Sequence, residues 1–174
     1  MRYTLLAVDP GPEHSAWLFL DASTGKILQF GKDSVADVRR IVREAGRDGI
    51  PLAIEIVIPY GATLGRSTLT TCEEVGRLET LHGGRVARAE RPDVVRHITG
   101  HLTRKGEKKA DTRVREHLIW RYVPGWDKYD KKGTLKTPEV LEGVSSDIWS
   151  ALAVGCYAMD CRRGELFGDV RKTG

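Results

Sequence analysis

The feature that most constrains the fold is an almost wholly apolar run of eight residues, 51–58 (PLAIEIVI). A strand that is apolar along its whole length is typical of a sheet that is covered on both faces, because a half-exposed strand would alternate apolar and polar residues. Glu55 alone interrupts this run. An unpaired carboxylate is costly to bury. Glu55 therefore needs a partner, and the sequence leaves open whether this is a metal ion or a core arginine.

The remaining pattern predicts an α/β fold. Short apolar runs bounded by turn residues predict strands at 4–8, 15–20, 26–30 and 85–89, in addition to 51–58. Helical periodicity and end signals predict helices at 35–45, 66–82, 92–98, 111–122 (with Asp111 as a candidate cap) and from Ser145 or Ser146 to about Cys161. This order indicates a five-stranded mixed sheet, its first three strands antiparallel, with helices on both faces. We expect one domain over residues 1–174.

Composition excludes several classes of protein. No apolar run reaches the roughly 20 residues that a membrane-spanning helix needs, and the N-terminus has no signal-peptide pattern. The three cysteines, Cys72, Cys156 and Cys161, form no CxxC pair, which favours reduced thiols over a disulfide framework or a zinc site. We therefore expect a cytoplasmic protein with no membrane partner and no small-molecule cofactor.

Charge is unevenly distributed along the chain. Residues 85–136 hold 15 Lys and Arg against 7 Asp and Glu, a balance of +8 in a chain whose total is +4. A basic segment beside an acidic remainder suits a protein that binds a polyanion and holds metal ions elsewhere. A solvated surface without a partner would give the same pattern.

Three acids lie at the ends of predicted elements. Asp9 closes the first strand, Glu55 lies in the apolar run, and Asp147 falls in the first turn of the last helix. If these carboxylates meet at one edge of the sheet, their mutual repulsion favours divalent cations, and two Mg²⁺ ions about 4 Å apart can hydrolyse a phosphodiester. Taken singly, Asp9 could be a turn residue, Glu55 the partner of an arginine and Asp147 a helix cap.

The ordered set of motifs resembles RuvC-type Holliday junction resolvases of the RNase H-like superfamily. Residues 6–11 (LAVDPG) resemble the first-strand signature of that family, 52–55 (LAIE) its second acidic strand, and 143–154 (GVSSDIWSALAV) its last helix. Residues 74–78 (EVGRL) and 109–119 (KADTRVREHLI) are especially similar to RuvC-like proteins encoded by bacteriophages. The resemblance therefore covers nearly the whole chain, in the family's order.

The resemblance implies an RNase H-like fold, a homodimer, paired nicks in a four-way junction and Mg²⁺ or Mn²⁺, with two ions per site. It assigns the catalytic and metal-binding roles to Asp9, Glu55 and Asp147. Bacterial members carry a further acid where this chain has Ser150, which leaves three alternatives open: the fourth ligand is absent, supplied from elsewhere or replaced by water. The basic residue that they place at the start of the penultimate helix falls near Asp111 here, and either Lys108 or Lys109 is a candidate substitute.

DNA contacts are expected from the basic segment, because phosphate binding depends on Lys and Arg. The candidates are Arg96, His101, Arg104, Lys105, Lys108, Lys109, Arg113 and Arg115, followed by Arg66 and Arg77 beside the helix after Glu55. Tyr60 is a candidate for stacking on an unpaired base, or it packs in a turn.

Three functions fit these observations. The first is a structure-selective endodeoxyribonuclease acting on Holliday junctions and other branched DNA. The second is a catalytically weak or inactive accessory that binds branched DNA. The presence of Ser150 in place of the further acid of bacterial members supports this alternative. The third is an RNase H-like enzyme acting on RNA–DNA hybrids.

Overall fold

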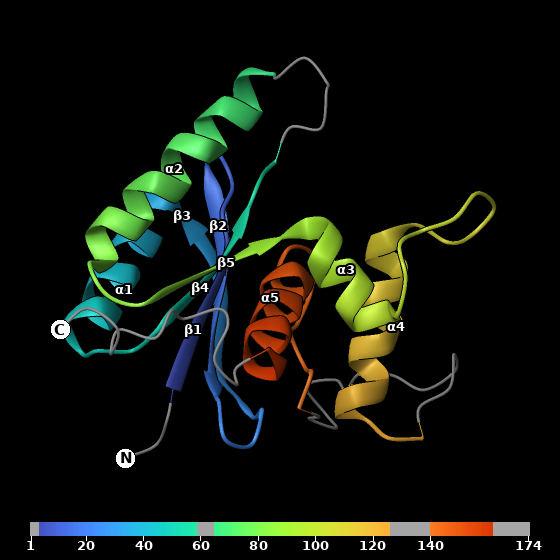
Figure 1. Ribbon diagram of the computed structural model, residues 1–174. Coiled ribbons are helices and arrows are strands. Elements are labelled where there is room, and N and C mark those ends of the chain that lie inside the picture. The colour runs from blue at the N-terminus through green and yellow to red at the C-terminus, as the bar shows by residue number, and fades with distance from the viewer. Residues whose placement is uncertain (1–3, 59–64, 126–139, 162–174) are drawn as a thin grey trace, which may run out of the picture.

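The computed structural model describes residues 4–58, 65–125 and 140–161 and contains the expected mixed sheet (Figure 1). Its strands lie in the order β3-β2-β1-β4-β5. Their bounds are β1 Thr4–Asp9, β2 His14–Asp21, β3 Ile27–Ser34, β4 Leu52–Ile56 and β5 Val86–Glu90. The first three strands are antiparallel, whereas β4 and β5 run parallel to β1. The predicted fold class and strand directions are confirmed.

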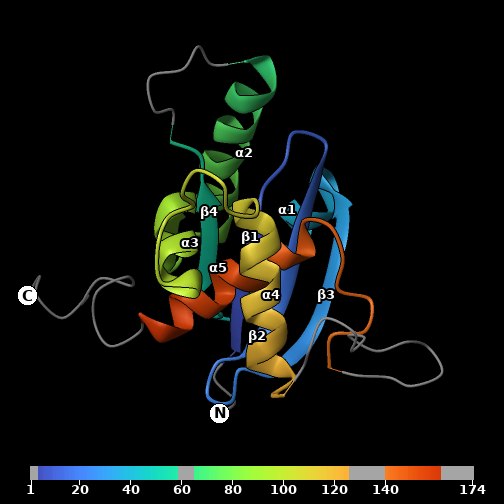
Figure 2. The same cartoon turned by 90° about the vertical axis from the view of Figure 1, so that its right-hand side faces the viewer.

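Helices cover both faces of this sheet. On one face lie α1 (Val35–Arg47) and α2 (Arg66–His82). On the other lie α3 (Arg91–Thr99), α4 (Ala110–Tyr122) and α5 (Ile148–Asp160). Figure 2, which looks onto the second face, shows α4 crossing in front of α5, so that α5 is enclosed between the sheet and α4. No helix within residues 4–58, 65–125 and 140–161 is both long and apolar enough to cross a bilayer.

The alternation of side chains along β1 explains why both faces are covered. Leu5 and Ala7 belong to the core on the α5 side, whereas Leu6 and Val8 belong to the core under α1 and α2. All four are buried. Because a strand points successive side chains to opposite faces, a continuous apolar run requires two cores.

Small residues let α5 lie close to the sheet. A Cβ atom placed on Gly155 of α5 would come within 2.5 Å of Leu20 Cδ1 and 3.2 Å of Ala7 Cβ. The sheet face beneath the helix is lined with alanines, namely Ala7, Ala16, Ala53, Ala87 and Ala89. Close packing of this kind tolerates little change in volume, so α5 is held in one position over β1 and β2.

Several predicted boundaries are corrected. β4 ends at Ile56, and Val57 is already 40% exposed, so the strand is shorter than its apolar run. β3 continues to Ser34, four residues beyond the predicted end. α5 begins only at Ile148, because Ser146 has a left-handed φ of 43° that a helix does not accommodate. Asp147 is thus the N-cap residue and does not lie in the first turn.

The close approach of α5 makes a direct prediction. Gly155→Ala should lower the free energy of unfolding by about 1–3 kcal/mol, because the added methyl overpacks the contact with Ala7. The matched control is Gly76→Ala in α2, where an added Cβ meets nothing within 4 Å. That change should stabilise the protein by about 0.5–1 kcal/mol through helix propensity. Urea denaturation measures both, and equal stabilisation by the two variants would contradict the packing described.

Candidate active site

The candidate active site begins with two acids on neighbouring parallel strands. Val8 of β1 is paired with Ile54 of β4, so that Asp9 and Glu55 follow at the same level. Both point to the α5 face, because each lies two residues after an alanine of that core. Sheet register thus brings together two carboxylates that are 46 positions apart in the chain.

The N-terminus of α5 brings Asp147 and Ser150 to the same place. The Ser150 hydroxyl donates a hydrogen bond to the Asp9 carboxylate, and the charge of Asp147 is close enough to affect the Asp9 pKa. The Asp147 side chain makes no capping hydrogen bond to its own helix. The alternative that this acid serves only as a side-chain cap is therefore excluded. Ser150, which occupies the position of the expected fourth acid, therefore contacts the first acid directly.

Burial and charge repulsion raise the pKa of Asp9 to about 7. Burial is the largest cause, and the charges of Glu55 and Asp147 add to it, whereas Arg91 and the Ser150 hydrogen bond act in the opposite direction. A buried carboxylate surrounded by other carboxylates favours its protonated form until a cation arrives. This burial and the two neighbouring carboxylates distinguish Asp9 from an exposed turn residue.

Glu55 has an arginine partner, which is one of the two alternatives that the sequence left open for this acid. Arg91 Nη1 lies 3.3 Å from Glu55 Oε2, and the other terminal nitrogen of the same guanidinium bonds Asp111. Burial raises the pKa of Glu55 and the Arg91 charge opposes this rise. Asp111 is thus not the cap of α4, whose N-cap is Lys109. The cation near the acids comes from the start of α3, and not from Lys108, which pairs with Glu116 at 2.5 Å.

Asp147 also has a cationic partner, which the sequence did not suggest. Lys32 Nζ lies 2.6 Å from Asp147 Oδ2, and both side chains are about half exposed (41% and 52%). Lys32 reaches Asp147 from β3, where it is paired with Ala16, which in turn is paired with Asp9. A row across the sheet therefore runs from Lys32 through Ala16 and Asp9 to Glu55.

The donor chemistry fits divalent metal ions. Four carboxylates, those of Asp9, Glu55, Asp111 and Asp147, face only two cations, Arg91 and Lys32, within these ion pairs. The cluster would carry a formal charge of −2 if all four carboxylates were ionised, and hard cations prefer such oxygen ligands. However, no three Asp, Glu, His or Cys side chains in the described residues are gathered closely enough to enclose an ion. Glu55 and Asp147 are held by Arg91 and Lys32 and would have to turn toward Asp9.

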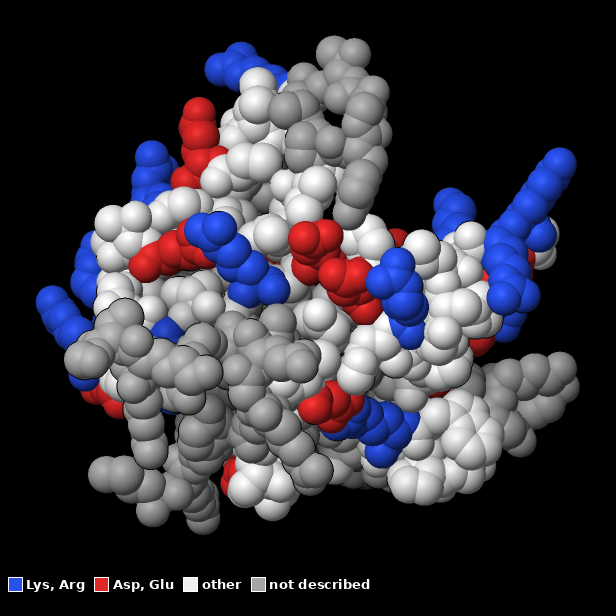
Figure 3. All heavy atoms as spheres, viewed as in Figure 1, with Lys and Arg blue, Asp and Glu red and all other residues white. Residues whose placement is uncertain are grey.

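The predicted DNA-binding residues fall into distinct groups. Arg66, Arg104, Lys105, Lys109 and Arg115 are exposed, and none has an ion pair within the described part of the chain. Arg96 and Arg77 are exposed but pair with Asp93 and Glu74. Figure 3, which is viewed as Figure 1 is, shows Lys and Arg side chains projecting at the right-hand side of the molecule, over the segment between α3 and α4. Tyr60 lies outside the described residues.

Burial argues against one of these predictions, and an ion pair engages a second residue. The Arg113 side chain is only 10% exposed and donates to Glu107, Thr99 and His101. His101 lies 3.0 Å from Glu107. Arg113 therefore holds residues 99–107 against α4 and presents little charge to a ligand, whereas His101 has a side chain that is 40% exposed and stays a predicted DNA contact. The helical periodicity could have indicated this, because Arg113 precedes Val114 on the inner side of α4.

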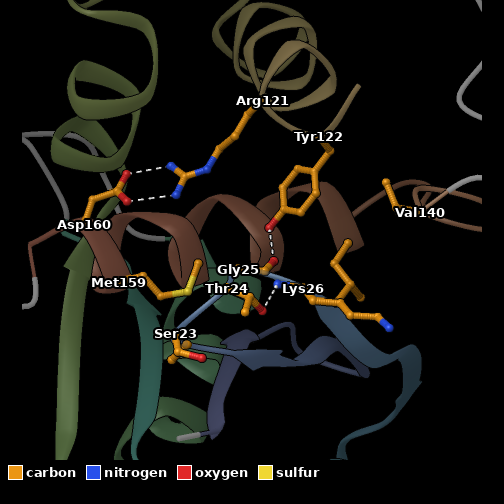
Figure 4. A pocket seen from close by; sticks show the side chains of 11 residues that line it. Ser23, Thr24, Gly25, Lys26, Arg121, Tyr122, Val140, Met159 and Asp160 are labelled. Atoms are coloured by element: carbon orange, nitrogen blue, oxygen red, sulfur yellow. Dashed lines mark hydrogen bonds and ion pairs between the residues drawn. The ribbon is translucent and has the colours of Figure 1, made fainter. Parts of the chain in front are cut away.

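A pocket at the opposite end of the sheet does not have this cluster of carboxylates. It has a volume of about 530 Å³ and lies between the β2–β3 turn and the C-terminal ends of α4 and α5. Figure 4 shows Arg121 and Asp160 pointing toward each other there, with two hydrogen bonds of 2.6 and 2.8 Å. Tyr122 donates to the carbonyl of Gly25 at 2.8 Å. These contacts attach α4 to the sheet and leave Asp160 neutralised.

Comparison with known proteins identifies the fold. No protein-family model matches the sequence, and no curated protein matches it. A structure of Thermus thermophilus RuvC in complex with a Holliday junction substrate aligns over 92% of this chain and 95% of its own, with a TM-score of 0.56 and 18% identity. A second T. thermophilus RuvC structure aligns over 91% and 95%, with a TM-score of 0.55 and 16% identity. The chain therefore has the RNase H-like fold that RuvC has.

The raised pKa of Asp9 predicts a pH-dependent stability in the absence of metal. The unfolded chain loses this proton near pH 4, whereas the folded chain keeps it to about pH 7. The Asp9 carboxyl therefore destabilises the fold increasingly as pH rises between these values. Asp9→Asn should be more stable than wild type at pH 8 in EDTA, by on the order of 2–4 kcal/mol, with the gain disappearing toward pH 4.

Asp21→Asn is the control, because its effect on stability at pH 8 should be opposite to that of Asp9→Asn. The pKa of Asp21 is lowered, first by the hydrogen bond from the Ser23 hydroxyl. Its carboxylate therefore stabilises the fold above the unfolded pKa, and the variant should lose stability at pH 8. Urea denaturation at pH 4.5, 6 and 8 measures both variants. A loss of stability for Asp9→Asn at pH 8 would show that the Asp9 carboxylate is held by favourable contacts.

Proposed function

We propose that this chain is a metal-dependent endodeoxyribonuclease that cuts Holliday junctions and other branched DNA. The observation that carries the proposal is that Asp9, Glu55 and Asp147 lie around the carboxyl ends of β1 and β4 and the start of α5, near enough for the charges of Glu55 and Asp147 to raise the pKa of Asp9. The structural likeness to RuvC supports it, because the same fold in T. thermophilus RuvC binds a Holliday junction substrate. The proposal includes a single nuclease domain over residues 1–174, acting as a homodimer that makes paired nicks.

The chain's own residues have separate roles in this activity. Asp9, Glu55 and Asp147 would hold Mg²⁺ or Mn²⁺, two ions per site, which supply a hydroxide nucleophile and stabilise the leaving 3′ oxygen. Ser150 orients the Asp9 carboxylate through its hydrogen bond. Arg91 and Lys32 hold Glu55 and Asp147 before the substrate arrives. When the two acids turn toward Asp9, both cations become available to the phosphate backbone.

The substrate would be held by exposed cations along one side of the site. Arg104, Lys105 and Lys109 follow α3 in an exposed segment, and Arg115 lines a cavity of about 270 Å³ beside Arg91, Asp147 and Ser150. Such residues contact phosphates without reading sequence. Arg66, Arg77 and Arg96 would contribute more weakly. We also place the chain with RuvC-like proteins of bacteriophages, a grouping that is based on the resemblance of the sequence motifs, including residues 74–78 and 109–119.

A second candidate function has a specific observation in its favour. Glu55 and Asp147 are each neutralised by a cation of the chain itself, and Ser150 replaces the expected fourth acid. A protein that binds branched DNA without cutting it could retain this arrangement. Nicking of the DNA distinguishes this accessory from the enzyme.

The test is cleavage of a synthetic four-way junction in Mg²⁺. Wild type should nick two opposed strands, and Asp147→Asn should lower the rate by at least about 100-fold, because one carboxylate ligand is lost. Binding of the junction, measured at one stated salt concentration, should be retained. Glu44→Gln, which changes an exposed acid of α1, should cut as wild type does.

The substrate panel decides between the candidates. It contains the junction, a flap, an RNA–DNA hybrid and linear duplex. Binding of the junction by wild type without Mg²⁺-dependent nicking would favour the accessory. Degradation of the hybrid with sparing of the junction would favour an RNase H-like activity instead.

A further inference from the structure

An apolar pocket opens directly beside the acids. It has a volume of about 550 Å³ and shares Glu55 and Arg91 with the site already described. The rest of its wall is almost wholly apolar and includes Ile56 and Val57 after β4, Pro92 and Val95 of α3, and Leu102 after α3. Pockets that bind small organic groups combine this size with apolar walls and few polar groups.

Two side chains of this pocket are exposed to water at an energetic cost. Val57 is 40% exposed and Leu102 is 43% exposed. Large apolar side chains gain from being covered. The two come from separate segments of the chain yet line one pocket, so a single apolar group could cover both. The pocket therefore has the properties of a binding surface that is completed by a ligand.

Positive charge at the rim limits what that ligand can be. Arg91 lines the pocket, but its charge is engaged by Glu55 and Asp111, so the positive charge at the rim comes from the residues that follow α3. The segment that supplies Leu102 continues into Arg104 and Lys105, which are exposed. The one acid of this segment, Glu107, is engaged by His101 and Arg113 and does not offset these charges at the rim. The ligand must therefore join an apolar, flat or compact group to an anionic chain.

We propose that this pocket receives one unpaired nucleobase of the DNA strand whose phosphate lies at the acids. A single strand of nucleic acid has both features, an anionic backbone and bases whose faces bind apolar side chains. A base next to the scissile phosphate is at the right place, because the pocket and the acids share Glu55. This inference rests on the proposed function and specifies which part of the substrate the protein recognises.

The pocket gives a physical reason for selecting branched DNA. A base in an intact duplex must be unpaired and unstacked before it can enter, whereas a base at a branch point has already lost part of these contacts. The pocket would therefore favour strands at crossovers, flaps and mismatches without reading the sequence of bases. Selection would come from the cost of extracting the base.

The test uses a four-way junction with 2-aminopurine at the crossover, bound in Ca²⁺ so that it is not cut. Fluorescence of this base analogue rises when it leaves the stack, and anisotropy of a second label gives the Kd. Wild type should raise the fluorescence on binding. Leu102→Gln should lose most of this rise and bind about tenfold more weakly, because a polar side chain replaces part of the apolar wall. Val57→Asn should act in the same direction.

Leu28→Gln is the matched control, since Leu28 lies on β3 and is exposed to the same degree, 42%. It should behave as wild type. The proposal would be overturned if both Leu102→Gln and Val57→Asn gave the same rise in 2-aminopurine fluorescence and the same Kd as wild type. A fall in oligomeric state of Leu102→Gln during sedimentation would also overturn it, by showing that a second copy of the chain fills the pocket. Wild-type cleavage in Mg²⁺, measured separately, distinguishes failure of the pocket from failure of the proposed function.

Discussion

The close packing of α5 on the alanine-lined face of the sheet is the contact on which the site depends. Because Gly155 brings the helix backbone against Ala7 and Leu20, the N-terminus of α5 lies over the end of β1. Asp147 and Ser150 then reach the Asp9 carboxylate. A bulkier interface would lift the helix and separate these groups, even though none of the interface residues belongs to the site. The small residues of the core thus determine the geometry of the acids.

Charge balance among the acids is the second constraint, and it links the structure of the site to the proposed reaction. Asp9 has no ion pair among the described residues, and its pKa is raised to about 7 by burial, Glu55 and Asp147, although the charge of Arg91 opposes this rise. Arg91 and Lys32 neutralise Glu55 and Asp147. These two ion pairs reduce the repulsion among the acids. Binding of divalent ions would exchange these internal partners for stronger ones.

Local patterns in the sequence predicted most of the fold and the three acids, whereas they missed the partners of those acids. Glu55 was conspicuous because one acid interrupted an apolar run. Lys32 and Arg91 gave no such signal, because each meets its partner through sheet register: Lys32 through Ala16 and Asp9, and Arg91 by following β5, whose Glu90 is paired with Ile56. Arg113 was assigned to DNA from its charge alone, whereas its side chain is buried on the inner side of α4, where it bonds Glu107 and Thr99.

The central claim is that Asp9, Glu55 and Asp147 chelate metal together. A crystal structure of the protein grown with Mn²⁺, with anomalous diffraction recorded at the manganese edge, tests it most directly. The account predicts anomalous peaks bounded by the three carboxylates, with Lys32 no longer on Asp147. Mn²⁺ absent from this place in well-ordered crystals, with both internal ion pairs intact, would contradict it.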